Sequence, residues 1–463
     1  MPCPFAPDRV TDTGPRRGDD SPAMVRHLRR GGPFAAVLLL IASAVSGQSA
    51  PSGSVSVTSD LFPNRSNTGE LRARVYAEKV FQPTAAVVVT VSGFADGLVG
   101  RRPPAVSRPN ATASDAVARV MDANVSYKGR RFEVLAGFSR IAWGRLDELQ
   151  PTDVINPLDV SRFFFESRSE ARLPVALVRA RTYLTEESAI EAIYVPFFRR
   201  GRFDQLDEPT SPFNLEAAFA PDTAACLAIG CPTVLPVVAG RREPARTAGN
   251  AQGGARFSTT TGRVDWSVVA YRGFEAFGFG VAGIPNPAAA FLPVDVVHPR
   301  FTMLGADLET VRGEWGVRGE VAAFVDDNFQ SPSLRVVKGS SLDAGVGVDR
   351  KAGRYRVSAT ALVHHEAYDE SLSSASPGER GRSDLSLIVS ADRTFARERY
   401  GVRTFGVFNA NESSGFLRAI TTAKVHDNFV LEGSAGWFIG DGRDIVGRFA
   451  DSDFVYARLK YYF

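Results

Sequence analysis

The last eleven residues, Asp453 to Phe463, read DFVYARLKYYF, and this stretch decides the fold. In an extended strand, successive side chains point to opposite faces. One face is then apolar and aromatic: Val455, Ala457, Leu459, Tyr461 and Phe463. The other face carries Tyr456, Arg458, Lys460 and Tyr462. This pattern predicts a sheet with lipid on one side and water on the other. A half-buried strand of a soluble domain shows the same alternation, so the stretch alone leaves both readings open.

The N-terminal region has the order of a secretory signal peptide, which is positive charge, then an apolar run, then small residues. These parts are Arg26, Arg29 and Arg30, then Phe34 to Val45, then Ser46 and Gly47. Met24 is the expected true start. We therefore expect residues 1–47 to be a leader and signal peptide, and residues 48–463 to form the exported barrel.

Composition and charge narrow the class of protein further. The chain has 463 residues, 44% hydrophobic and 23% charged, with a formal net charge of +3. This charge provides no basic field for nucleic acid. After Ala50 no apolar run approaches the roughly 18 residues that a membrane helix needs, so a membrane crossing must use strands.

A final amphipathic strand with an aromatic end also resembles the assembly signal of Gram-negative outer-membrane barrels. It implies that Tyr461 and Phe463 engage the barrel assembly machinery.

From Ser54 onward the sequence repeats alternating strands joined by tight polar turns and, between these hairpins, by longer segments. The clearest turns are Gly129-Arg130, Thr261-Gly262-Arg263, Arg312-Gly313-Glu314, Lys351-Ala352-Gly353 and His426-Asp427-Asn428. The long segments are about Asp96 to Ala113, Ala142 to Leu173, Arg199 to Asn250, Glu275 to Pro299, Asp326 to Gly339 and Ala367 to Arg382. Short turns in the periplasm and long extracellular loops are typical of an outer-membrane barrel.

The fold that we predict is all-β, a transmembrane antiparallel β-barrel of about eighteen strands (16–18) in the cell outer membrane. The first short strand, Val55 to Leu61, is expected to pair with the last strand. A barrel of this size is too wide for its own side chains to fill, so its lumen holds water unless loops close it.

The loop after Trp143 has the highest density of charge and is the candidate site. A charged loop folded into a wide barrel would narrow the pore, and its opposed charges would set a transverse field. The candidate constriction residues are Arg145, Asp147, Asp153, Asp159, Arg162, Glu166 and Arg168. Alternatively, these charges pair among themselves in a capping loop, with Asn156-Pro157 as a turn and Phe163 to Phe165 on the barrel rim. The three Phe side chains could instead form a path for apolar solutes.

Two pieces of the sequence resemble an uncharacterised, porin-like family of proteobacterial outer-membrane proteins, known as a domain of unknown function. The first piece is Trp143-Gly144-Arg145, then Asp153-Val154-Ile155-Asn156-Pro157, then Glu170-Ala171-Arg172-Leu173-Pro174. The second is Met303 to Asp307 with Gly313 to Glu320. Arg145 stands where the family pattern has an acidic residue. The resemblance implies a barrel that passes small or hydrophobic molecules, with no established substrate.

No pattern predicts an enzyme, a metal site or a cofactor. The four His after the leader lie in no motif with Ser and an acid, and the neighbours His364 and His365 point to opposite faces of a strand. Cys226 and Cys231 are the only cysteines after the leader, and in an exported chain they predict a local disulfide.

The function that we expect is a porin-like channel for small solutes. One alternative is a transporter for hydrophobic compounds, lipid or terpenoid-like, that works with an envelope export system. A non-conducting structural or adhesive barrel is the other. The expected partners are outer-membrane lipids and lipopolysaccharide, the barrel assembly machinery, and a periplasmic or inner-membrane transport protein, but not nucleic acid.

Overall fold

The computed structural model describes residues 52–65, 68–101, 112–160, 165, 167–202, 213, 235–283, 291–372, 380–441, 444 and 446–463. Several sequence predictions lie outside these ranges: the leader and signal peptide (residues 1–47), Cys226, Cys231, Arg162, Glu166, Phe163 and Phe164. Within the described ranges, no helix is both long enough and apolar enough to cross a membrane.

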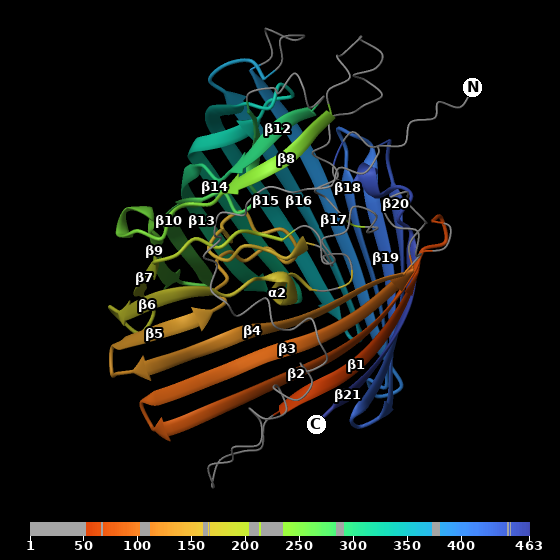
Figure 1. The fold of residues 1–463 in the computed structure, drawn as a ribbon. Coiled ribbons are helices and arrows are strands. Elements are labelled where there is room, and N and C mark those ends of the chain that lie inside the picture. Colours follow the sequence, from red (N-terminus) through yellow and green to blue (C-terminus); the bar gives the residue numbers. More distant parts are fainter. Residues whose placement is uncertain are drawn as a thin grey trace, which may run out of the picture.

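Eighteen strands form one sheet in which each strand pairs antiparallel with the next and the last pairs with the first (Figure 1). They are β1 (Ser52–Leu61), β2 (Gly69–Thr84), β3 (Val87–Arg101), β4 (Thr112–Lys128), β5 (Phe132–Ser139), β6 (Val175–Tyr183), β7 (Ala189–Val195), β9 (Gln252–Thr261), β10 (Val264–Phe274), β13 (Arg300–Arg312), β14 (Trp315–Gln330), β15 (Val336–Ala352), β16 (Tyr355–Tyr368), β17 (Gly381–Phe395), β18 (Tyr400–Asn409), β19 (Ser414–His426), β20 (Phe429–Ile439) and β21 (Phe454–Tyr462). The predicted barrel and its strand number are confirmed.

The barrel closes where β1 meets β21. Their register runs from Ser54 opposite Tyr462 to Leu61 opposite Val455, which confirms the predicted pairing of the first and last strands. Beyond it, the backbones of Gly53 and Phe463 exchange two hydrogen bonds of 3.0 and 3.1 Å. A Cβ at Gly53 would lie 2.5 Å from Cζ of Phe463, so the terminal ring packs where only glycine fits.

The two faces of the wall differ in polarity as the alternation predicts. On β21, Val455 and Leu459 are each 47% exposed, whereas Tyr456 is 2% exposed. The outward side chains of other strands are equally apolar, for example Val57, Leu71, Val346, Leu417 and Leu431. Apolar side chains are exposed on the outer face in every part of the closed wall, as expected for a surface in contact with lipid. The buried polar side chains line the interior.

The two ends of the barrel differ in the length of their connections. Turns at one end are short, and Gly262, Gly313 and Gly353 take φ values of +63°, +61° and +62° there, which favour glycine. Outward aromatic side chains gather next to this end: Tyr127, Phe132, Trp315, Tyr355, Phe395, Tyr400, Phe429 and Tyr461. Such a girdle marks a membrane interface. The long segments lie at the other end.

Two of the long segments predicted as loops contain strands. β8 (Leu235–Arg242) pairs in parallel with β12 (Phe291–Val297), and β12 pairs antiparallel with β11 (Phe279–Ala282). This small sheet is fastened to the β14–β15 connection, because the amide of Ala282 donates to the carbonyl of Leu334 at 2.9 Å. The prediction missed it because short pairings between distant segments leave no local period.

Candidate functional site

The connection between β5 and β6 turns into the barrel. We call its described residues, 140–160, 165 and 167–174, the inner segment. Figure 1 shows its short helix α2 (Arg168–Ala171) enclosed by the wall strands. The segment contacts strands on several sides of the lumen, as the following contacts show, and so it does not lie as a cap on the rim.

Asn156 holds the two ends of the inner segment together. Its Oδ1 accepts a hydrogen bond from the amide of Ile141 at 2.7 Å, next to the end of β5. Its Nδ2 donates to the carbonyls of Ser139 at 3.1 Å and Leu173 at 2.8 Å. Asn156 is only 3% exposed. The Asn-Pro step predicted as a turn is thus a bend whose side chain joins the start and the end of the segment.

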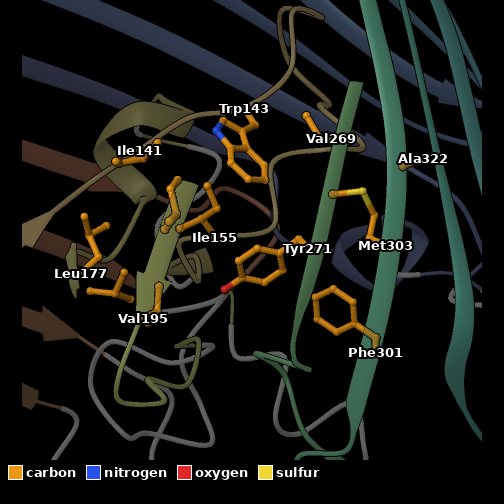
Figure 2. Close-up of a cluster of buried hydrophobic side chains, with 12 residues drawn as sticks. Ile141, Trp143, Ile155, Leu177, Val195, Val269, Tyr271, Phe301, Met303 and Ala322 are labelled. Atoms are coloured by element: carbon orange, nitrogen blue, oxygen red, sulfur yellow. The ribbon is translucent and has the colours of Figure 1, made fainter. Parts of the chain in front are cut away.

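Trp143 anchors the segment to the wall through packing. It is 1% exposed and meets the ring of Tyr271 edge-on at 6.2 Å between centroids. Its Nε1 donates to Oε1 of Glu191 on β7 at 2.9 Å, which satisfies the buried indole N–H. Figure 2 shows Trp143 and Ile155 facing Val269 and Tyr271 of β10. The cluster also contains Ile141, Val175, Leu177, Ile193, Val195, Phe301, Met303 and Ala322.

A single wall carboxylate, Glu320 on β14, receives the tip of the segment. Its Oε2 accepts the amides of Arg145 at 2.9 Å and Leu146 at 3.1 Å. Its Oε1 accepts the amide of Thr152 at 2.7 Å and the Thr152 hydroxyl at 2.8 Å. N–H donors of the backbone that converge on a buried carboxylate stabilise its negative charge, so that no cation needs to contact it directly.

Arg145 extends this attachment to β13. Its Nε lies 2.5 Å from Asp307 and its Nη1 lies 2.9 Å from Glu309. Burial acts against the charge of Arg145, but its hydrogen bonds to these two carboxylates raise its pKa above the ordinary value for arginine. Asp307 is shared with Arg256 of β9 at 3.0 Å. Arg145 is therefore a cation fixed between two wall carboxylates.

Two acidic residues that follow reach other strands. Asp147 pairs with Arg318 of β14 at 3.0 Å, and Glu148 pairs with Arg403 of β18 at 2.6 Å. Their side chains keep 44% and 32% exposure. These carboxylates border open space inside the barrel.

The remaining predicted constriction residues divide between the wall and the interior of the segment. Asp159 pairs with Arg119 of β4 at 2.9 Å. Asp153, whose side chain is completely buried, pairs with Arg172 at 2.6 Å and Arg168 at 3.2 Å. Asp153 and Arg168 thus stabilise the segment, whereas Arg145, Asp147 and Asp159 connect it to the wall.

Two cavities border the inner segment. The first has a volume of about 560 Å³ and lies against β1–β4 and β21, with Arg140 and Glu170 on the segment side. The second has a volume of about 520 Å³ and lies against β16–β18, with Asp147 and Glu148 on the segment side. Most residues of both linings are polar or charged, so each cavity is suited to hydrated solutes.

Phe165 occupies the interior of an aromatic cluster. It is 2% exposed, and its ring centroid is 4.6 Å from that of Phe454 and 5.2 Å from that of Phe213. Other members are Phe62, Phe416, Phe438, Phe449 and Tyr456. Phe165 therefore fills space between the inner segment and the wall.

The neighbouring histidines differ as the sequence predicts. Nδ1 of His364 lies 2.7 Å from Asp343 and its Nε2 lies 3.0 Å from Glu366, while His365 is exposed and contacts Ser383. Within the described part of the chain, no group of three His, Cys, Asp or Glu side chains is arranged to hold a metal ion.

Sequence reasoning missed Glu320, Glu148, Arg318 and Arg403 as parts of this site. A signal for Glu320 and Asp307 was present, because both lie in the second of the two family-like pieces. The structure brings the pieces together: Arg145 of the first pairs with Asp307, and its backbone donates to Glu320.

A model of the family described as "Protein of unknown function (DUF1302)" matches residues 108–392, more than half of the chain. The chain belongs to this family. The predicted resemblance is confirmed, and both pieces of sequence that meet at Glu320 lie within the DUF1302 match. No curated protein matches the sequence.

Among solved structures, the DUF1302 chain is similar to OccK5 (OpdH) of Pseudomonas aeruginosa, with 9% identity over 89% of this chain and 96% of that chain and a TM-score of 0.47. OccAB3 of Acinetobacter baumannii has 9% identity over 89% and 99%, with a TM-score of 0.45. OpdK of Pseudomonas aeruginosa, solved with vanillate, has 8% identity over 89% and 98%, with a TM-score of 0.45.

The closed wall, its apolar outer face and its aromatic girdle place this DUF1302 protein in the outer membrane as a porin-like barrel.

Proposed function

We propose that the protein is a passive channel for small polar solutes, and that the inner segment forms its constriction. The observation that carries this proposal is the position of the segment. It is fastened to β13, β14 and β18 through Arg145, Asp147 and Glu148. Two cavities lined mostly by polar or charged residues nevertheless remain beside it. Fixed charges of both signs next to water would select solutes by charge and dipole.

Planar-bilayer recordings with the purified barrel test this function. We expect stepwise increases in conductance as single barrels insert, because water and ions would pass beside the inner segment. A barrel that inserts and stays silent would overturn the proposal. If such a silent barrel binds lipid-like or terpenoid-like compounds in detergent, a transporter for hydrophobic compounds replaces the channel. If it binds none, a structural barrel is the remaining function.

A further inference from the structure

The cavity along β1–β4 and β21 has an unusual balance of charge. Among the described residues, five basic side chains and one acidic side chain line it: Arg72, Arg74, Arg140, Arg458, Lys460 and, as the acid, Glu170. The cations come from β2, β21 and the inner segment, so they face the cavity from different sides. Tyr76, Phe94 and Met121 add apolar surface to the same lining.

Two carboxylates that pair with these arginines, Asp96 and Asp122, lie outside the described lining. Asp96 holds Arg74 through two hydrogen bonds of 2.6 and 2.9 Å, and Asp122 holds Arg140 at 2.7 Å. The Asp96 side chain is 3% exposed against 18% for Arg74, and Asp122 is 14% exposed against 24% for Arg140. The pairs therefore fix the guanidinium groups in place and leave them as the more accessible partners.

Lys460 adds a charge that no carboxylate of the described residues balances. Among the described residues, its Nζ has no ion-pair partner and lies 4.8 Å from the ring centroid of Tyr462. The carboxylate of the described lining belongs to Glu170, whose Oε2 accepts the amide of Ser167 at the start of α2. The described lining thus carries more cationic than anionic side chains.

The second cavity differs in this respect. Its lining has three carboxylates, Asp147, Glu148 and Asp392, and two guanidinium groups, Arg356 and Arg403. Arg403 pairs with both Glu148 at 2.6 Å and Asp392 at 3.5 Å. The inner segment therefore borders two cavities whose described linings have opposite excess charge.

We propose that the cavity along β1–β4 and β21 is a binding site for small organic carboxylates. This inference rests on the proposed channel function for the route by which the solute arrives. Arginine side chains bind a carboxylate through paired N–H donors, Lys460 adds long-range attraction, and the apolar body of the solute contacts Phe94 and Tyr76. The second cavity, with its excess of carboxylates, does not hold such anions.

Equilibrium binding to the full barrel in detergent tests the site, with benzoate as the probe and benzyl alcohol as its neutral counterpart. We expect benzoate to bind and benzyl alcohol not to bind. The variant Arg140→Gln/Lys460→Gln should weaken benzoate binding by about tenfold or more, the size expected for lost charge-assisted hydrogen bonds. The control variant Arg356→Gln, in the second cavity and away from the contacts of the inner segment, should stay within about twofold.

The single variant Lys460→Met breaks no ion pair, so it keeps the test decisive if the double variant fails to fold. Equal benzoate affinity in Lys460→Met and the native barrel, or equal binding of benzyl alcohol, would overturn the site. The measurement does not depend on conduction. A silent barrel that binds benzoate contradicts the channel but keeps the site, whereas a conducting barrel that binds no benzoate contradicts the site alone.

Discussion

Gly144 lies against Glu320 so closely that no side chain fits between them. A Cβ at Gly144 would lie 2.6 Å from Oε1 of Glu320, and the φ of Gly144 is +94°. The close approach allows the next amides of the inner segment, those of Arg145 and Leu146, to reach the same carboxylate. One glycine thus lets a wall side chain hold the tip of the segment.

Gly144→Ala should detach this tip from β14. The added methyl group meets Glu320, and an alanine at positive φ costs about 1 kcal/mol or more by itself. We expect a changed single-channel conductance with more fluctuation between levels. Gly353→Ala is the matched control, because Gly353 also has positive φ but its Cβ would meet nothing within 4 Å. Identical conductance in the two variants would show that contact with Glu320 does not position the segment.

Asp147 and Glu148 should govern ion selectivity, whereas Asp153 should not. The first two border the second cavity, while the Asp153 side chain is completely buried against Arg172. Asp147→Asn/Glu148→Gln should shift the reversal potential in a salt gradient toward anions, because negative charge leaves the water-filled region. An unchanged reversal potential would exclude these two carboxylates from the conduction path.

Asp153→Asn provides the contrast within the same segment. It leaves Arg172 and Arg168 buried without their carboxylate, a loss that typically costs about 3–5 kcal/mol. We expect a lower thermal midpoint, faster proteolysis within the inner segment and unchanged selectivity of the channels that remain folded. Normal stability with altered selectivity would place Asp153 in the pore instead.

The sequence predicts the barrel well because the relevant signals are local. Alternation with period two distinguishes the outward Val455 and Leu459 from the inward Tyr456, and turn glycines such as Gly313 and Gly353 mark the short end. It also locates the charged segment after Trp143. Each of these features depends on neighbouring residues only.

The division of labour within the site could not be predicted. Asp147 and Asp153 have the same chemistry and lie six positions apart, yet one borders a cavity and the other is buried inside the segment. That difference arises from contacts with strands far away in sequence, such as the attachment to Glu320. Glu320 itself resembles any inward polar residue of a barrel strand until its partners are known.

Asn156→Ala should loosen the whole inner segment at its base. The change leaves the amide of Ile141 and the carbonyl of Leu173 without their partner in a buried place, and each such group costs about 1–3 kcal/mol. Hydrogen exchange of residues 141–156 should accelerate while the wall strands keep their protection. Asn411→Ala, which removes an exposed bond to the amide of Leu385, is the control and should leave the segment protected.

Glu275, at the long-segment end just after β10, should make stability depend on pH. Burial raises its pKa to about 8 from the ordinary 4.5, and nearby Asp327 adds to the effect. Between these values the folded protein keeps a proton that the unfolded chain releases, so stability falls as pH rises through this window and levels off above about 8. Below about pH 4.5 Glu275 is protonated in both the folded and the unfolded protein, so its contribution to stability is fully present there.

Glu275→Gln carries the neutral group at every pH, so it should flatten this part of the profile and raise the thermal midpoint relative to the native protein most strongly above pH 8. Thermal unfolding from pH 4 to 9 measures the difference between the two proteins. Glu187→Gln, which changes an exposed carboxylate in the short turn between β6 and β7, should run parallel to the native curve. A Glu275→Gln curve that is also parallel to the native one would mean that Glu275 is ionised in the folded barrel at neutral pH.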